Sequence, residues 1–313
     1  MALITSDVER FQAARPRLEA IAYRLLGSAS EAEDAVQETF LRWQAAGVER
    51  IEVPEAWLTK ALTNLCLNQL TSARARRETY VGRWLPEPLL AGDPMLGPAD
   101  TIEQRESVSY AVLVLLERLS PSERAVYVLR EAFDYPHREI ADMLDITEAA
   151  SQQIFHRAKK HVAGGKARTE IDEAAARRIV EEFLAAATSG RTEPLVRLLT
   201  QDAVSVGDGG GKVAARAKAF EGALAVAKFL RGLFKPSDAK RAYVGGAPEI
   251  YAATANGEPA VVAVVDGRVI GITCLEVTEE GIVALRSQAN PDKLVRASER
   301  WATAAHGSPL YIL

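Results

Sequence analysis

The chain has 313 residues and a formal net charge of −4, and this length predicts two or three domains. No apolar run is long enough to span a membrane and the start lacks a secretory signal, so we expect a cytoplasmic protein. The two cysteines, Cys66 and Cys274, and the four histidines are scattered, which argues against a disulfide framework or a metal site.

The first predicted helix carries an apolar stripe at helical spacing. The stripe consists of Leu18, Ile21, Ala22 and Leu25. Gly27 stands where a glycine can end this helix, and Ser30 is predicted to cap the next one. The second predicted helix contains DAVQETFLRW, residues 34–43, and turns Val36, Phe40 and Trp43 inward. A compact charged and amide surface is left outside, made of Asp34, Gln37, Glu38 and Arg42.

Pro54 is predicted to begin a third helix. Its apolar stripe consists of Trp57, Leu58, Ala61, Leu62 and Leu65. A polar stripe runs beside it at every fourth residue and then passes into a basic run, and together they comprise Lys60, Asn64, Asn68, Arg74, Arg76 and Arg77.

The linker that follows contains YVGRWLPEPL, residues 80–89. Pro86 and Pro88 forbid a continuous helix. Trp84 and Leu85 are unusually apolar for a linker, because flexible linkers are ordinarily rich in Gly, Ser or charge.

Residues 139–162 predict a helix-turn-helix. Ile140, Met143 and Leu144 give the first helix one apolar face, and Thr147 is the expected N-cap of the second. The outward face of that second helix holds Gln152, Gln153, His156, Arg157 and Lys160. Gln pairs with adenine edges and Arg or Lys with guanine edges or phosphates, so the face suits DNA. The alternative is an ordinary helical hairpin with a solvated basic end. Asp145 departs from the glycine usual in such turns.

These helices resemble, in order, the two conserved regions of bacterial sigma factors, and more narrowly of the extracytoplasmic-function group. The resemblance implies that the DAVQETFLRW surface docks on core RNA polymerase, at the clamp of the β′ subunit, with the β subunit as a further partner. It implies that the third helix opens promoter DNA near −10 and that the helix-turn-helix binds the −35 element. The acidic total charge suggests weak DNA binding by the free protein, so polymerase would supply most of the affinity.

A third domain is predicted from residue 171, after a break at Gly164 and Gly165. Helices near 172–184, 193–199 and 219–234 are expected, with strands near 203–206, 241–251, 260–265, 268–277 and 281–288. Asp266-Gly267 predicts a hairpin turn. This order gives an α+β cone, as in SnoaL-like or NTF2-like folds. After Leu294 the tail contains the helix-forming stretch SERWATAA, residues 298–305, and then an apolar ending, HGSPLYIL, which we expect to dock on a neighbouring domain or to be disordered.

Two further motifs, DGGGK at 208–212 and NPDKL at 290–294, extend the resemblance to sigma factors with a SnoaL-like extension. In that group the extension is thought to regulate the sigma factor in cis. We expect both motifs to meet the linker at one regulatory interface, with Asp292 and Lys293 exposed. Its residues are Trp84, Leu85, Asp208, Gly209, Gly210, Gly211, Lys212, Asn290, Pro291, Asp292, Lys293 and Leu294. DGGGK lacks the spacing of a phosphate-binding loop, so a tight turn is favoured.

The expected organisation is region 2 at 1–77, a linker at 78–105, region 4 at 106–164 and the SnoaL-like domain at 171–313. We expect no catalytic residues and no cofactor, because the acid–base candidates do not form a convergent set. These candidates are Asp202, Asp208, Tyr243, Tyr251 and Asp266. The third domain could hold a small apolar ligand or have a filled core. Alternative functions are a helix-turn-helix regulator with a ligand-sensing domain and, more remotely, a SnoaL-like enzyme.

Overall fold

The computed structural model describes residues 5–47, 51–78, 80–97, 101–162, 172–213 and 218–313. Contacts divide the chain into two compact units. The first unit comprises residues 1–79 and 92–165, and the second comprises residues 80–91 and 166–313. The predicted break at Gly164 and Gly165 lies outside the described residues.

The first unit begins with α1 (Thr5–Leu26), α2 (Ala29–Ala45) and α3 (Pro54–Glu78), which pack on one another. The predicted stripe of α1 is confirmed, because Leu18, Ile21 and Leu25 are fully buried. Gly27 ends α1 at φ 68°, and its N–H donates to the carbonyl of Tyr23 over 2.8 Å. The predicted cap Ser30 is wrong. Ser28 caps α2 instead, since its hydroxyl accepts from the Glu31 N–H.

The remaining helices of the first unit are short. They are η2 (Pro94–Leu96), α4 (Ile102–Ser107), α5 (Tyr110–Leu116), α6 (Pro121–Tyr127), a π-helical turn η3 (Val128–Ala132), α7 (His137–Leu144) and α8 (Glu148–Val162). The predicted region 2 and region 4 segments both lie in this compact unit.

Two buried arginines join these parts of the first unit. Arg24 of α1 donates to Ser107 Oγ over 3.0 Å and to the Leu96 carbonyl over 2.7 Å. Arg124 of α6 donates to the Leu25 carbonyl over 2.7 Å and pairs with Glu117. Burial lowers the pKa of Arg24 to about 10 and that of Arg124 to about 9. Both therefore stay charged at neutral pH, and each buried cation has the partners that its burial requires.

The second unit is the predicted α+β cone. Its helices are α9 (Glu173–Thr188), α10 (Glu193–Leu198), α11 (Ala223–Leu233), α12 (Asp238–Val244), η4 (Pro291–Lys293) and α13 (Val295–Thr303). Its strands are β1 (Leu199–Asp208), β2 (Phe220–Glu221), β3 (Glu249–Ala255), β4 (Glu258–Val265), β5 (Arg268–Thr278), β6 (Gly281–Gln288) and β7 (Tyr311–Ile312).

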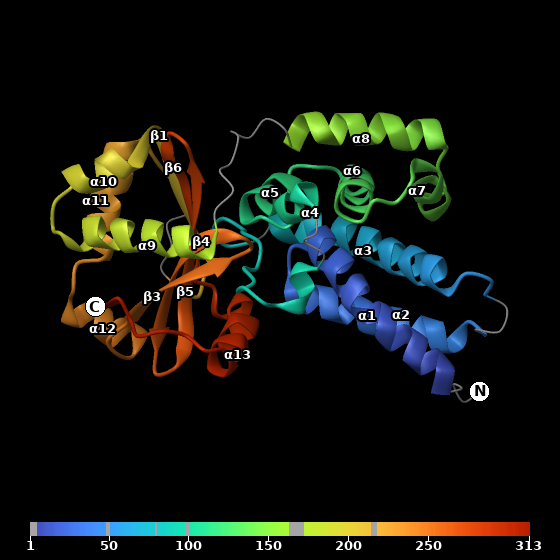
Figure 1. Cartoon of the computed structure of the whole chain (residues 1–313), viewed down its shortest axis with the longest axis horizontal. Helices are drawn as coiled ribbons and strands as arrows, with labels where there is room; N and C mark the ends of the chain where they lie inside the picture. Colours follow the sequence, from blue (N-terminus) through green and yellow to red (C-terminus); the bar gives the residue numbers. More distant parts are fainter. Residues whose placement is uncertain (1–4, 48–50, 79, 98–100, 163–171, 214–217) are drawn as a thin grey trace. The chain divides into compact units, whose positions relative to one another are not determined.

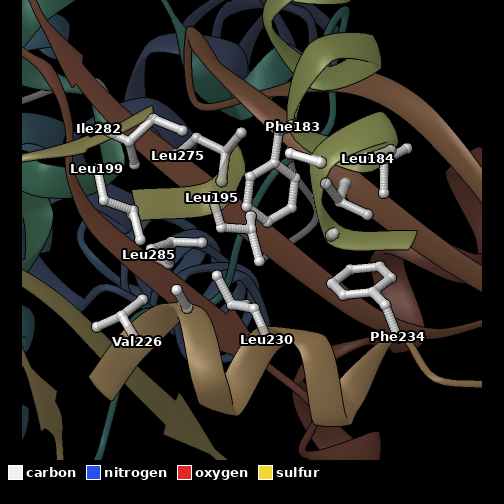
Figure 2. Packing of buried hydrophobic residues seen from close by; sticks show 14 of the residues in the cluster. Phe183, Leu184, Leu195, Leu199, Val226, Leu230, Phe234, Leu275, Ile282 and Leu285 are labelled. Carbon is white, nitrogen blue, oxygen red and sulfur yellow. The ribbon is translucent and has the colours of Figure 1, made fainter. Parts of the chain in front are cut away.

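The strands form one sheet in the order β2-β1-β6-β5-β4-β3-β7, in which β1 and β6 run parallel and the other neighbours antiparallel. Helix α9 contacts β3 and β4, and α11 contacts β1 (Figure 1). Between helices and sheet lies the apolar core, where Phe183, Leu230 and Leu285 converge (Figure 2). The predicted hairpin at Asp266-Gly267 is confirmed by φ angles of 49° and 76°.

Two details of this unit differ from the sequence prediction. The strand predicted at 241–251 begins only at Glu249, because residues 238–244 form α12 and Gly245 ends it at φ 86°. The apolar tail pairs as β7 with β3, at Glu249↔Ile312 and Ile250↔Tyr311. Across the described ranges, no helix is both long and apolar enough to cross a membrane.

Candidate nucleic-acid interface and linker clamp

The predicted polymerase surface forms one patch on α2. Asp34, Gln37 and Arg42 are exposed, and Glu38 is half-buried. Arg42 Nε lies 3.1 Å from Glu38 Oε1, an exposed pair one helical turn apart. The sequence analysis missed Leu41, which is 52% exposed on the same face of α2. Its position seven residues after Asp34, on the same helical face, was the available signal.

One residue of the polar stripe of α3 is already hydrogen-bonded within the first unit. Asn64 is half-buried and Asn68 is exposed. Lys60 Nζ donates to the Asp142 carbonyl over 2.6 Å and to Asp145 Oδ1 over 2.9 Å. The basic run Arg74, Arg76 and Arg77 belongs to the helical span of α3, but these side chains lie outside the described residues.

The second helix of the helix-turn-helix, α8, presents the predicted polar face. Ser151 and Ala158 are fully buried against the rest of the unit. The Thr147 hydroxyl accepts from the Ala150 N–H over 3.1 Å, as an N-cap should. The five DNA-binding candidates of α8 are all exposed. They are Gln152, Gln153, His156, Arg157 and Lys160.

The turn between α7 and α8 explains why a glycine is usual there. Asp145 has φ 53° and ψ 45°, the left-handed conformation that glycine adopts most readily. The N–H groups of Asp145 and Ile146 both donate to the Ala141 carbonyl and so close α7. Asp tolerates this conformation better than most residues. Its carboxylate in addition reaches Lys60 of α3, a contact that glycine could not make.

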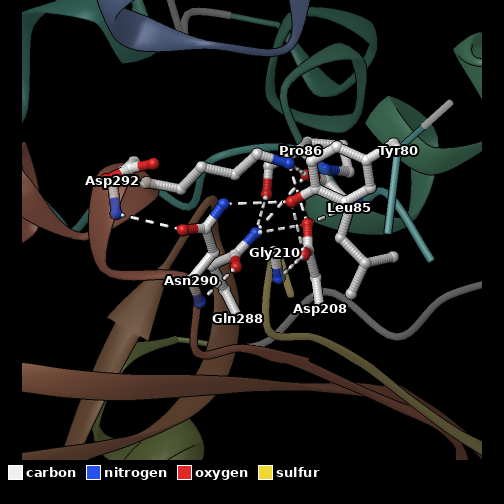
Figure 3. A network of polar contacts seen from close by, with 9 residues as sticks. Tyr80, Leu85, Pro86, Asp208, Gly210, Gln288, Asn290 and Asp292 are labelled. Atoms are coloured by element: carbon white, nitrogen blue, oxygen red, sulfur yellow. Dashed lines mark hydrogen bonds and ion pairs between the residues drawn. The ribbon is translucent and has the colours of Figure 1, made fainter. Parts of the chain in front are cut away.

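In the second unit, the linker is held by a buried carboxylate. Asp208 Oδ2 accepts from the Leu85 N–H over 2.9 Å and from Lys293 Nζ over 2.8 Å (Figure 3). Asp208 Oδ1 accepts from Tyr80 Oη over 2.7 Å and from the Gly210 N–H over 2.9 Å. We call this group, with Gln288 and Asn290, the linker clamp. It unites residues from the linker, DGGGK and NPDKL.

The electrostatics of the linker clamp favour an ionised Asp208. Burial by itself raises the pKa of Asp208, but the charge and hydrogen bond of Lys293 and the bonds from Leu85 and Tyr80 lower it below its usual value. Burial and the bond to Asp208 raise the pKa of Tyr80. Lys293 Nζ also lies 4.1 Å from the centre of the Trp84 ring. Its side chain is only 11% exposed, so the expected exposure of Lys293 is wrong, whereas that of Asp292 is confirmed.

Close backbone approach explains the glycines of DGGGK. Gly210 and Gly211 have φ of 60° and 72°, which suits glycine. A Cβ on Gly210 would lie 2.4 Å from the side chain of Asn290, and one on Gly211 would lie 3.0 Å from Val81. Lys212 pairs instead with Asp292 over 2.7 Å. The motif is a tight turn against the linker, and its lysine is engaged in an ion pair.

Two polar residues hydrogen-bond the linker backbone, and the sequence analysis did not predict these contacts. Gln288 Nε2 donates to the carbonyls of Leu85 and Pro86 over 3.4 and 3.3 Å. Asn256, fully buried in the β3–β4 hairpin, accepts from the Leu89 N–H over 2.8 Å. The dipeptide Asn256-Gly257 between two strands was the available signal for that hairpin. Nothing local marks Gln288 as a linker contact.

The NPDKL turn completes the linker clamp. Asn290 Nδ2 donates to Tyr80 Oη over 3.0 Å, and the Asn290 N–H donates to Gln288 Oε1 over 2.9 Å. Pro291 begins the short helix η4, and Leu294 is buried at 2% exposure. Leu85 of the linker is also buried, at 1% exposure. The structure thus brings the three sequence motifs together within the second unit.

Comparison with known proteins identifies the family. The models "Sigma-70 region 2" and "Sigma-70, region 4" match residues 10–76 and 109–162. The ECF RNA polymerase sigma factor SigJ of Mycobacterium tuberculosis is 36% identical over 297 residues, which cover 92% of this chain and 93% of SigJ. This chain belongs to the extracytoplasmic-function (ECF) sigma factors.

Other relatives agree with this membership. The probable ECF sigma factor SigI of Mycobacterium tuberculosis is 29% identical, over 91% of this chain and 93% of its own length. The crystal structure of SigJ from the same organism superposes with a TM-score of 0.70 at 34% identity, and covers 91% of this chain and 97% of that one. The likeness therefore includes the α+β extension as well as both sigma regions.

The acid–base candidates of the extension are engaged at separate places. Asp208 belongs to the linker clamp, and Asp202 accepts from Thr200 Oγ1 over 2.9 Å. Tyr251 Oη donates to Glu249 over 2.6 Å, and Asp266 lies in a hairpin turn. Asp208, Asp202 and Tyr251 therefore each bond a different partner.

Proposed function

We propose that this ECF sigma factor binds core RNA polymerase through the α2 patch and directs it to promoters through α3 and α8. The observation that carries this proposal is that each candidate set with described side chains lies on one helical face. Asp34, Gln37 and Arg42 share the exposed side of α2 with Leu41, an apolar residue suited to a protein interface. A helix-turn-helix regulator acting without polymerase would leave this patch without a role.

DNA binding by α3 is proposed to open the first unit. Lys60, a candidate for the −10 element, is bonded to the turn of the helix-turn-helix at Asp142 and Asp145. This turn takes two of the three N–H groups of the Lys60 ammonium, so a phosphate would compete with the turn for the same lysine. We infer that the two regions separate when polymerase and promoter bind, and that the exposed Lys60–Asp145 pair is weak enough to permit this.

The second unit is proposed to regulate this opening in cis through the linker clamp. The linker between the two sigma regions limits how far apart they can reach on promoter DNA. Holding residues 80–91 in the second unit removes about 40 Å of extended reach, at roughly 3.5 Å per residue. Release of the clamp would restore that reach. The extension is proposed to act by binding rather than by catalysis, and the apolar ligand suggested by the sequence remains part of the proposal.

The polymerase interface is tested by charge reversal on α2. The double variant Asp34→Arg, Glu38→Arg is expected to lose co-purification with core polymerase at least about tenfold, because exposed substitutions seldom affect folding. The matched control is Glu9→Arg, Glu55→Arg, which reverses two exposed glutamates on α1 and α3. Unchanged polymerase binding by the folded α2 variant would remove the docking proposal.

The −35 interface is tested in the reconstituted holoenzyme on a promoter library. Gln152→Ala or Gln153→Ala is expected to relax the preference at one base position by roughly 1–3 kcal/mol. Lys160→Ala is expected to weaken all promoters about equally, since a phosphate contact carries no sequence information. If neither glutamine variant changes the −35 preference, α8 does not read bases as proposed.

A further inference from the structure

The second unit contains a cavity of about 520 Å³, which offers a place for the apolar ligand of the proposed function. Its lining residues come from β1, β4, β5 and β6 on the sheet side and from α11 and α12 on the helical side. Small-molecule sites in proteins commonly range from about 300 to 1,000 Å³, so the cavity is large enough for one ligand.

The walls of the cavity are predominantly apolar. Phe220 and Phe229 stack with ring centroids 4.2 Å apart, and Ile250, Val261 and Ile272 line the interior as buried residues. Among the described residues of the lining there is no Asp, Glu or His. Such walls favour an apolar body and provide no side chain for carboxylate- or histidine-based acid–base chemistry.

The remaining lining includes cations on exposed residues. They are Lys218, Lys235, Lys240 and Arg241. Lys240 Nζ donates to the carbonyls of Leu233 and Lys235 over 3.1 and 2.8 Å, and Arg241 Nε donates to the Leu313 main-chain oxygen. Arg241 in addition forms a long ion pair with Asp238, over 3.9 Å. A positive rim around an apolar interior complements a molecule with one anionic head and an apolar body.

One wall of the cavity is continuous with the linker clamp. Gly207, Ser287 and Gln288 line the cavity, and β1 pairs with β6 here at Gly207↔Ser287 and Asp208↔Gln288. The amide of Gln288 donates to linker carbonyls over 3.3 and 3.4 Å and to Asp208 Oδ2 over 3.2 Å. These distances are long for hydrogen bonds, and one amide group serves three acceptors. A small displacement of Gln288 therefore changes the contacts that hold the linker.

We propose that this cavity binds a free apolar carboxylic acid of medium chain length, and that its occupancy is transmitted through Gln288 to the linker clamp. The apolar chain fills the space between sheet and α11, and the carboxylate lies at the rim near Lys218 and Lys235. The binding step stands on the cavity alone. The transmission step rests on the proposed regulation in cis.

The probe is sodium decanoate, kept below its micelle concentration and titrated calorimetrically into the full-length protein. Decanoate is expected to bind about tenfold more tightly than decanol, and decyltrimethylammonium is expected to bind weakest. The double variant Lys218→Gln, Lys235→Gln should weaken decanoate about tenfold and leave decanol unchanged, in line with two partly screened ion pairs. Lys228→Gln, an exposed lysine of α11 outside the lining, is the matched control and should change nothing.

A second variant tests the volume of the cavity. Ala263→Phe places a ring in the space and should abolish binding of both decanoate and decanol. Equal binding of the three amphiphiles, binding that survives Ala263→Phe in the folded protein, or binding only to anionic lipid vesicles would each overturn the proposed ligand class.

Transmission is read from hydrogen exchange at the Leu85 and Leu89 amides. Saturating decanoate is expected to change exchange at Leu85, which lies beside Gln288, by at least about threefold, and to leave Leu89 unchanged. Gln288→Leu should abolish the change while decanoate still binds. Binding without a change at Leu85 would overturn transmission. Run-off transcription without decanoate tests the sigma function separately, so a failure there leaves the binding result intact.

Discussion

The linker clamp of the second unit and the Lys60 bridge of the first unit use the same chemistry in opposite surroundings. Each joins a lysine to an aspartate, over 2.8 Å for Lys293–Asp208 and 2.9 Å for Lys60–Asp145. In the clamp the two side chains are 11% and 0% exposed, whereas in the bridge they are 41% and 80% exposed. Distance alone would rank the two pairs as equal.

Burial separates them in energy. An exposed ion pair contributes about 0–1 kcal/mol and is screened by salt. A buried pair gains little over an apolar pair, but removal of one partner typically costs about 3–5 kcal/mol, because the other charge is left buried. The clamp is therefore suited to hold the linker until a specific signal disturbs it. The bridge is suited to open whenever a competing partner such as DNA phosphate arrives.

The largest effect is expected for Asp208→Ala. The substitution leaves the charge of Lys293 uncompensated and removes the acceptor of the Leu85 N–H. The free energy that stabilises the linker clamp should therefore fall by about 3–5 kcal/mol. Hydrogen exchange at Leu85 reports this loss directly. Asp202→Ala, an exposed aspartate on the same strand, is the control and should cost less than about 1 kcal/mol. A comparable cost for both variants would mean that the clamp is no stronger than the bridge.

Acid should weaken the same contact. Because the folded-state pKa of Asp208 is lowered, its contribution is fully present above the unfolded-state value of about 3.9 and is lost as pH falls through the folded-state value. The free energy of unfolding of the wild type should exceed that of Asp208→Asn by a constant amount from pH 7 to about 5. The gap should shrink below about pH 4. Urea unfolding of both proteins measures it, and a gap that keeps its full pH 7 size down to pH 2.5 would contradict the lowered pKa of Asp208.

Gly210→Ala separates steric fit from charge within the clamp. The new Cβ meets the Asn290 side chain at 2.4 Å and also takes an unfavourable φ of 60°, so we expect a loss of about 2–3 kcal/mol. Gly190→Ala is the matched control, because Gly190 has φ 74° and no atom within 4 Å of its Cβ. It should cost about 1 kcal/mol from the backbone alone. Thermal unfolding measures the loss of stability in both variants. Equal losses would show that the Asn290 side chain moves aside at no cost.

The sequence predicted much of this architecture for identifiable reasons. Helical spacing placed the faces of α1, α2 and α8, and the odd apolar pair Trp84-Leu85 marked the linker as a packed segment. The start of the strand predicted at 241–251 was wrong, because RAYV fits a strand as well as a short helix. Gly245, which ends α12 in the left-handed conformation, was the signal for a helix end.

Contacts between distant residues could not be predicted from local patterns. Gln288 holds a linker more than two hundred positions away, and Lys60 meets a turn 85 positions away. Lys60 was assigned to DNA from its place in the polar stripe of α3, and nothing near it in sequence indicates a protein partner. Buried Arg24 and Arg124 likewise become visible only in the packed unit, since arginine is most often exposed.

The smallest effect is expected for Asp145→Asn, which removes the negative charge of the bridge and keeps a residue that tolerates a left-handed backbone. Spin labels on Ser72→Cys of α3 and Ala149→Cys of α8 report separation of the two regions, because native Cys66 and Cys274 are buried. At ~0.15 M salt, the fraction of long distances between the two labels should be about three times larger in the variant than in the wild type. At ~1 M salt the two fractions should become equal, because exposed ion pairs are screened. Asp134→Asn is the control, since Asp134 has φ 55° and forms an ion pair over 2.9 Å with Arg130, four residues before it. A rise that persists at high salt, or that equally follows Asp134→Asn, would show that the Lys60–Asp145 charge does not hold the first unit closed.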